Sequence, residues 1–349
     1  MARRYGKNRY GSLRYILPVI VIVAVILVLW LRNPNNTHAN SDNTDTQTTR
    51  NQQQKNPPSA DDDSSKQDLT SRTTQKTPIN KQPDKTTESD KPKVQKRIIS
   101  AEAQKAFTQG QKACESRQYL QAARYLSDAV RLGLTPEMET QVRKMLNEAS
   151  DHWLFARNIY EDDPFCLNHR VAGGELLIHI QKKYNVPYEL IMRINGITDA
   201  RSIGVGTTLK VVQGPFNAVV DRRRFIMSVY LGDLLVRTYR VGLGKPGRDT
   251  PTGEWLVELK QPNPAWTDPD THIRYEPDDP ENPLGERWIR LKGVKGAAVK
   301  RTGFGIHGTI KPEEIGKAAS RGCIRLFNGD VRELYDMLIP GQSHVYVLN

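Results

Sequence analysis

A long polar stretch divides the chain into parts that must fold separately. Residues 33–97 consist mainly of Asn, Gln, Ser, Thr, Asp, Lys and Pro, with almost no large apolar side chain. Such a segment cannot bury enough apolar surface to offset its chain entropy, so we expect a disordered linker. A flexible coil of about 65 residues averages roughly 45 Å end to end. We therefore expect the folded domains after it, within residues 98–349.

An apolar run precedes this linker. Residues 15–31 contain no charged side chain, and the residues before them are basic. Such a run lies at the short end of what spans a bilayer core. The positive-inside rule then predicts that residues 1–32 form a cytoplasmic tail and a transmembrane helix, with the rest of the chain extracytoplasmic, in the periplasm or cell wall. A cleavable signal peptide is the alternative, although no Ala-x-Ala site follows the run.

The formal net charge of +12 does not indicate a nucleic-acid partner. Six of the basic residues fall within residues 1–32, where no Asp or Glu occurs, and the others are spread among acidic residues. No basic stripe with interleaved aromatic residues is visible, so nucleic-acid binding is not expected. The histidines are scattered without ligand spacing, so we expect no metal and no cofactor.

Three cysteines are too few for a disulfide framework. Cys114 and Cys166 could pair with each other if Cys323 stays reduced. They fall in different expected domains, which favours two buried free thiols.

Residues 98–160 show helical periodicity, with a break at Gly133 and Pro136 before a third helix. Their small and apolar residues match the offsets of one tetratricopeptide-like (TPR-like) unit, at Gly110, Ala122, Leu126 and Ala129. One repeat cannot build the usual concave binding surface. A packing or spacer role and a protein-docking role therefore both remain open.

Residues 165–213 form a second unit with the pattern strand, helix, helix, strand. The Asn195-Gly196 pair ends the second helix, and a strand follows it. This pattern resembles a LysM domain, a βααβ module that binds the N-acetylglucosamine chains of peptidoglycan or chitin. The resemblance places the sugar groove at Gly174, Glu175, Leu176 and Asn195. The family usually has Asp-Thr at Glu175-Leu176 and an aromatic residue at His169, so a purely structural spacer is the alternative.

Residues 215–349 contain many short β-type segments separated by turn signals. One helix begins near Asn328, which we expect to cap it. The composition predicts a mostly-β sandwich or barrel with this one short helix.

A histidine motif and a cysteine motif stand out within this last region: His307-Gly308-Thr309, and the segment from Ser320 through Gly322-Cys323 to Arg325. A cysteine nucleophile needs a nearby base, because the thiolate is the reactive form. A glycine beside it allows a tight turn and exposes N–H groups that can hold an oxyanion. The plain alternative is a buried cysteine and an unrelated core histidine.

Both motifs, together with Thr250-Pro251-Thr252-Gly253, resemble the signature of L,D-transpeptidases with a YkuD-type domain. The resemblance implies that Cys323 attacks a peptidoglycan stem peptide, usually at a diamino acid in the third position, and that His307 is the base. It also implies that the Gly308 carbonyl orients the imidazole and that N–H groups of Gly322 and Cys323 hold the oxyanion. The product would be a 3→3 cross-link between stem peptides.

Four further residues are candidate substrate contacts. Arg325 either pairs with a substrate carboxylate or anchors its loop. Ser320 either hydrogen-bonds near the His307–Cys323 pair or is an ordinary strand hydroxyl. The long irregular segment 261–287 is expected to cover the substrate, with Trp266 and Tyr275 as contacts.

Three alternative functions remain open. Water in place of an amine as acceptor would make the protein an L,D-carboxypeptidase, and a protein lysine would attach proteins to the wall. An inactive wall-binding scaffold is the third. Peptidoglycan is the expected partner in each case.

Overall fold

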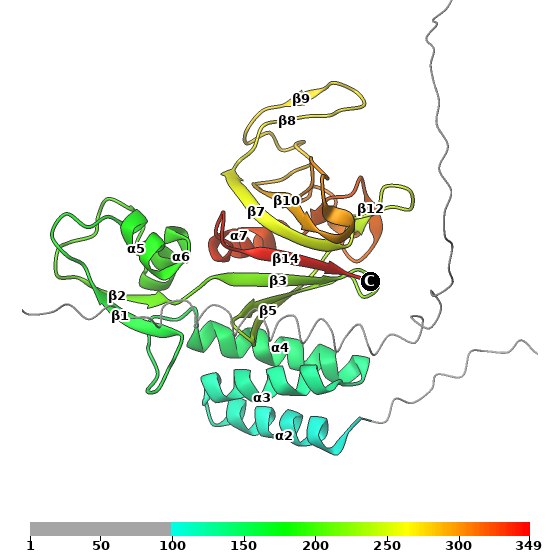
Figure 1. Ribbon diagram of the computed structural model, residues 1–349. Coiled ribbons are helices and arrows are strands. Elements are labelled where there is room, and N and C mark those ends of the chain that lie inside the picture. The colour runs from blue at the N-terminus through cyan, green and yellow to red at the C-terminus, as the bar shows by residue number, and fades with distance from the viewer. Residues whose placement is uncertain (1–98) are drawn as a thin grey trace, which may run out of the picture. The chain divides into compact units, whose positions relative to one another are not determined.

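The computed structural model describes residues 99–349 (Figure 1). The predicted anchor at 15–31 and the predicted linker at 33–97 lie outside the described residues. Within 99–349, no helix is both long enough and apolar enough to cross a bilayer. The Cys114, Cys166 and Cys323 side chains are free thiols; Cys166 is buried, whereas Cys114 is only half-buried.

The helices predicted for residues 98–160 are α2 (Ala101–Glu115), α3 (Tyr119–Leu132) and α4 (Pro136–Trp153). The Ser100 hydroxyl accepts a hydrogen bond from the Ala103 N–H and caps α2. Pro136 begins α4 at a position where its missing N–H has no cost. A Cβ at Gly110 would lie 2.5 Å from Leu126 Cδ2, so α2 and α3 approach too closely for a larger residue.

Helices α3 and α4 pack against strand β5 (Leu234–Arg240) of the following domain. Leu235 of β5 joins the apolar cluster of the helices. Ser127 Oγ accepts a hydrogen bond from the Leu235 N–H at 3.1 Å, and Asn147 Oδ1 accepts one from the Thr238 N–H at 3.0 Å. The helical unit thus packs on the catalytic domain, and a protein-docking role stays a prediction.

The LysM-like unit consists of β1 (Cys166–Arg170), α5 (Leu177–Tyr184), α6 (Tyr188–Asn195) and β2 (Thr208–Val212). Its two strands are antiparallel, with Cys166 opposite Val212. The predicted βααβ order is confirmed.

Lys210 of β2 joins this unit to the end of α4. Its amine is buried and donates to the carbonyls of Trp153, Ala156 and Asn158 at 2.6, 2.8 and 2.6 Å. These carbonyls at and beyond the helix end lack partners within α4. Burial lowers the pKa of the Lys210 amine, because desolvation disfavours its charge.

The third domain is built on a mixed sheet with the strand order β13-β11-β10-β7-β14-β3-β4-β5. The order has two ends, so the sheet is open and the barrel alternative is not observed. Neighbouring strands are antiparallel except for the parallel pairs β14–β3 and β11–β13. Its strands are β3 (Phe216–Asp221), β4 (Ile226–Leu231), β5, β7 (Gly253–Pro262), β10 (Arg287–Lys295), β11 (Gly305–His307), β13 (Ile324–Arg325) and β14 (His344–Leu348).

Smaller elements complete this domain. Strands β6 (Leu243–Gly244) and β12 (Ala318–Ser320) pair in parallel, and β8 (Trp266–Thr267) and β9 (Arg274–Tyr275) form a hairpin. Short 3₁₀ turns lie at Gly296–Ala298 (η1) and Pro312–Glu314 (η2).

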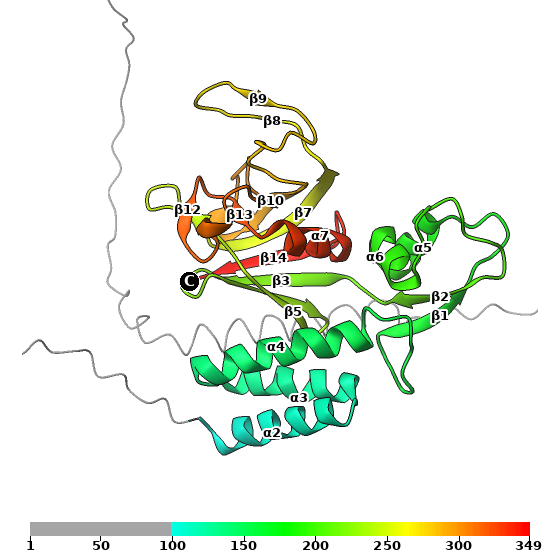
Figure 2. The same ribbon diagram turned by 180° about the vertical axis from the view of Figure 1, so that it is seen from behind.

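Helix α7 (Asn328–Met337) packs against β10 and β11 (Figure 2). It begins where predicted, but the expected cap at Asn328 is wrong. Phe327 occupies the cap position, and no side chain caps the helix. The Asn328 carboxamide instead accepts a hydrogen bond from the Thr309 N–H at 3.0 Å.

Replacing Lys210 by Met should destabilise the protein by about 2–4 kcal/mol, because buried carbonyls then lose their donor. Lys182→Met is the matched control, since Lys182 is exposed in the same domain, and should change stability by less than about 0.5 kcal/mol. Urea denaturation followed by circular dichroism measures both. Equal stability of the two variants would contradict the role assigned to Lys210.

Candidate active site

The histidine and cysteine motifs meet on adjacent parallel strands. In the pairing of β11 with β13, Ile306 lies opposite Ile324 and His307 lies opposite Arg325. Side chains alternate between the two faces of a sheet, so residues two apart share a face. Cys323 directly precedes β13, two positions before Arg325, and we infer from the same alternation that its side chain lies on the face that carries His307.

The His307 ring is buried and fixed by its neighbour. Its Nδ1 lies 2.7 Å from the Gly308 carbonyl oxygen. A carbonyl only accepts, so Nδ1 carries the proton and Nε2 of the neutral ring keeps its lone pair. Burial, with the nearby charge of Arg325, lowers the pKa of His307 to about 3, although the carbonyls of Gly308 and Leu284 favour the charged ring. The imidazole is therefore neutral at ordinary pH.

The Cys323 thiol is half-buried, and its Sγ lies 3.7 Å from the Gly303 carbonyl oxygen. Desolvation raises the pKa of Cys323, while a hydrogen bond from the Gly305 backbone and the charge of Arg325 act in the opposite direction. Both groups are therefore neutral at rest: Cys323 as the thiol and His307 as the neutral imidazole.

Gly322 holds a backbone conformation that suits only glycine. Its φ is +119°, and a Cβ there would lie 2.8 Å from the Phe304 ring. The Thr250 hydroxyl donates to the Gly322 carbonyl at 2.8 Å. Thr250 is buried and braces the loop 320–323, which we call the nucleophile loop. This role was not predicted, although the place of Thr250 in the Thr-Pro-Thr-Gly motif was a signal for it.

The Ser320 hydroxyl bridges the nucleophile turn. It donates to the Cys323 carbonyl at 2.6 Å and accepts from the Gly322 N–H at 3.1 Å. These hydrogen bonds agree with the alternative that places the Ser320 hydroxyl near Cys323, and a substrate contact through Ser320 stays a prediction. The Gly322 N–H, one of the two predicted oxyanion donors, is already bonded to the Ser320 hydroxyl. The Cys323 N–H makes no hydrogen bond within residues 99–349, so it is the donor that is available.

Asn328 shapes the loop that follows His307. A Cβ at Gly308 would lie 2.0 Å from Asn328 Oδ1, so this position accommodates only glycine. The same oxygen holds the Thr309 N–H. Asn328 thereby fixes the Gly308 carbonyl that orients the imidazole. The sequence analysis expected Asn328 to be a helix cap and did not predict this role.

The Arg325 side chain is engaged within the domain. Its guanidinium forms an ion pair with Glu314, and its backbone N–H and carbonyl pair with Gly242. Its Nε is buried without a hydrogen-bond partner. The geometry is that of the anchoring alternative, and a substrate contact through Arg325 stays a prediction.

The segment 261–287 is tied to the nucleophile loop. Arg321 forms ion pairs with Asp268 at 3.1 Å and with Asp270 at 2.7 Å. The rings of Trp266 and Tyr275 stack on each other with centroids 5.8 Å apart. Neither ring makes a ring contact or hydrogen bond with His307 or Cys323 within the described chain, so their substrate roles stay predictions.

A cavity of about 480 Å³ lies at the base of this segment. Its lining includes Asn263, Asp278, Arg287 and Asn328, so it reaches the residue that braces the His307 loop. Gly285, also in the lining, lies against the backbone of Thr309.

In the LysM-like unit, two residues that depart from the family pattern, His169 and Glu175, contact each other. The Glu175 carboxylate accepts from the Ala172 N–H and lies 2.9 Å from His169 Nε2. The other ring nitrogen of His169 lies 3.0 Å from the Tyr184 hydroxyl. These contacts fix the loop that begins at Gly174.

The other predicted sugar contacts differ in exposure. Leu176 is 55% exposed, at the surface of the loop. The Asn195 amide instead donates to the carbonyls of Ile191 and Lys210 and accepts from the Lys210 N–H. Asn195 thus fastens α6 to β2, and its predicted contact with sugar remains untested.

Two family models match the chain: the L,D-transpeptidase catalytic domain over residues 215–347 and the LysM domain over residues 169–212. A relative from Bacillus licheniformis, named L,D-transpeptidase YkuD, is 29% identical over 188 residues, covering 52% of this chain and 98% of the relative. Its namesake from Bacillus subtilis is 27% identical over 186 residues, with the same coverage of 52% and 98%.

A crystal structure of an L,D-transpeptidase from Mycobacterium tuberculosis is 18% identical, with a TM-score of 0.32. The match covers 42% of this chain and 64% of that one. The match of the two family models, in the order the motifs predicted, identifies the protein as an enzyme of the L,D-transpeptidase family whose YkuD-type catalytic domain follows a LysM domain.

Proposed function

We propose that the protein cross-links peptidoglycan by joining the third residue of one stem peptide to the third residue of another. The observation that carries this proposal is the β11–β13 register, which brings Cys323 to the face of His307. The hydrogen bond from His307 Nδ1 to Gly308 leaves Nε2 to accept a proton. These are the two groups that a cysteine acyl transfer needs.

In the first half-reaction, Cys323 Sγ attacks the carbonyl carbon of the third stem residue, and His307 Nε2 takes the thiol proton. The Cys323 N–H donates to the oxyanion that forms. The bond to the terminal D-alanine then breaks, and the imidazolium returns its proton to the leaving amine. The product of this step is a thioester on Cys323.

In the second half-reaction, the side-chain amine of the third residue of a neighbouring stem attacks the thioester. His307 accepts the proton of the amine and returns it to the sulfur as the thioester breaks. The amide formed is the 3→3 cross-link, and the thiol is regenerated. The segment 261–287, which Asp268 and Asp270 tie to Arg321, would favour an amine over water as the acceptor by covering the bound substrate.

The rest of the chain supports action on a polymer at the membrane surface. The LysM domain would hold glycan strands through the loop at Gly174–Leu176. The anchor at 15–31 and the linker at 33–97 would hold the enzyme on the outer side of the cytoplasmic membrane. Protease protection of spheroplasts, with cleavage of the catalytic part from outside, tests this location.

Purified protein incubated with a disaccharide-tetrapeptide should yield a dimer that has lost one D-alanine. The Cys323→Ala variant should yield none, because no thioester can form. Mass spectrometry of the products measures both.

The products also discriminate between the alternatives. D-alanine loss that gives only the tripeptide would replace the proposal by an L,D-carboxypeptidase. Transfer to a lysine of an added protein would indicate protein attachment to the wall. No product from the folded wild-type protein would favour an inactive scaffold.

Alkylation of Cys323 by iodoacetamide should accelerate only as the pH rises toward and above the ordinary thiol pKa of about 8.5. The reason is that desolvation raises the pKa of Cys323 and that His307 is neutral, so no thiolate–imidazolium pair forms at rest. Peptide mapping over pH 4–10 measures the rate, and the Cys323→Ala variant gives the background from Cys114. A rate already maximal near pH 6 would contradict the neutral pair.

Ser320→Ala should lower the rate of acylation about 10- to 100-fold, since a bridge that fixes the Gly322–Cys323 turn is lost. The melting temperature should change little, whereas the acylation rate falls. The exposed Ser202→Ala in the LysM domain serves as the control. Full activity of Ser320→Ala would show that the bridge is dispensable.

A further inference from the structure

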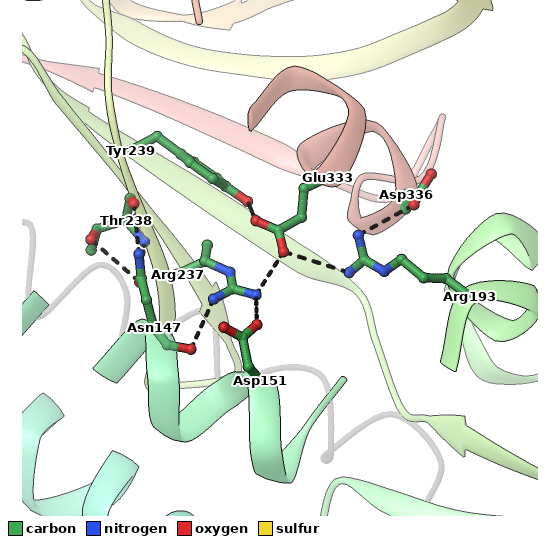
Figure 3. A network of polar contacts seen from close by, with 8 residues as sticks. All are labelled: Asn147, Asp151, Arg193, Arg237, Thr238, Tyr239, Glu333 and Asp336. Carbon is green, nitrogen blue, oxygen red and sulfur yellow. Dashed lines mark hydrogen bonds and ion pairs between the residues drawn. The ribbon is translucent and has the colours of Figure 1, made fainter. Parts of the chain in front are cut away.

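Side chains from all three folded units meet around one buried guanidinium (Figure 3). Arg237 of β5 is 3% exposed. It donates to the Glu333 carboxylate of α7 at 2.6 Å, to the Asn147 carbonyl of α4 at 2.8 Å, and to the Asp151 carboxylate of α4. We call the cluster of Asp151, Phe155, Arg193, Arg237, Glu333 and Asp336 the Arg237 junction.

The LysM domain enters this junction through Arg193 at the end of α6. Arg193 forms an ion pair with Asp336 of α7 at 3.3 Å and lies 3.9 Å from Glu333, the partner of Arg237. Both guanidinium groups also lie over the ring of Phe155, just beyond α4, at 4.9 Å for Arg193 and 4.6 Å for Arg237. One carboxylate and one aromatic ring are thus shared by arginines of two domains.

A second contact fixes the other end of α6. Glu189 forms an ion pair with Lys260 of β7 at 3.7 Å. The Lys260 side chain is only 6% exposed, donates to the Tyr335 carbonyl of α7 at 2.5 Å and lies over the Tyr335 ring at 4.0 Å. Helix α6 therefore contacts the catalytic domain at two points, and two contacts restrain rotation where one would not.

The connection between the two domains adds little freedom. Only the segment 213–215 separates β2 from β3. The Gly214 N–H donates to the Tyr184 carbonyl, and a Cβ at Gly214 would lie 2.2 Å from the Asn185 carbonyl oxygen. The connection is therefore packed against the LysM domain.

The contacts to the catalytic domain leave the proposed sugar loops open. The interface uses Glu189 and Arg193 of α6, whereas Leu176 and Val205 are 55% and 74% exposed. A glycan strand can reach these loops without displacing the junction.

We propose that Glu189 and Arg193 are positioning residues that hold the LysM domain at one orientation to Cys323. A glycan strand bound by the LysM domain would then present its stem peptides to the nucleophile in one register. This inference rests on the proposed function for the identity of the substrate. The benefit arises only for a substrate long enough to occupy both sites, where binding at one raises the effective concentration at the other.

The double variant Glu189→Gln/Arg193→Gln tests whether the fixed orientation of the LysM domain speeds turnover of a polymeric substrate. On the soluble disaccharide-tetrapeptide, which cannot span both sites, its rate should stay within twofold of the wild-type rate. On polymeric sacculi, kcat/KM should fall about tenfold because orientation is lost. Binding to insoluble peptidoglycan should be unchanged, and Arg193→Lys should retain part of the polymer activity.

The matched control is Lys182→Gln/Lys183→Gln, which alters two exposed residues of the same domain and should change neither rate. An equal fall on both substrates would overturn the positioning role, since it would indicate general damage. Unchanged turnover of sacculi would overturn it as well.

Pulsed electron paramagnetic resonance tests the geometric part without catalysis. Spin labels at Val205→Cys and Val294→Cys, both on exposed positions, are placed in the full chain after replacement of its three native cysteines. One narrow distance distribution is expected, and it should broaden in the Glu189→Gln/Arg193→Gln background. A broad distribution in the protein with the wild-type junction would overturn the proposal even if transpeptidation is observed. A narrow distribution that broadens in the double variant would support the fixed orientation even if no transpeptidation is observed.

Discussion

The parallel pairing of β11 with β13 is the constraint on which the catalytic arrangement depends. Only two residue pairs form it, so the register must be secured from outside. Arg325 is held by Glu314 and by the backbone of Gly242 on one side. Asn328 at the start of α7 holds the loop beyond His307 on the other. A shift of one residue would turn Cys323 to the opposite face of the sheet.

Burial sets the chemistry of the pair. An exposed cysteine–histidine pair can rest as thiolate and imidazolium, but a charge on a buried ring such as that of His307 is costly. Here both groups are neutral at rest, and in the proposed mechanism charge develops only when substrate arrives. In the proposed mechanism the nucleophile is therefore activated during acylation and not beforehand.

Sequence reasoning predicted the LysM and L,D-transpeptidase domains and most strands because each has a local signal: periodicity, turn residues or a long motif. The same motif named His307 and Cys323, whose catalytic roles stay predictions. Sequence reasoning missed contacts that join distant segments. Arg321 lies inside the cysteine motif and was given no role there, yet it ties the segment 261–287 to the nucleophile loop. Asn328 was interpreted through its neighbours in sequence, whereas its partner is Thr309 on another element. The Arg237 junction had no signal, since ion pairs between domains leave no pattern along the chain.

Strand β5 ends the sheet, and its outer backbone groups are bonded by Ser127 and Asn147 rather than by another strand. An uncovered sheet edge is a template on which a second chain can add a strand. The helical unit therefore also acts as a guard against intermolecular β-pairing. Shortening the protein to the two domains that match family models would remove this guard and favour aggregation, even though His307 and Cys323 would remain.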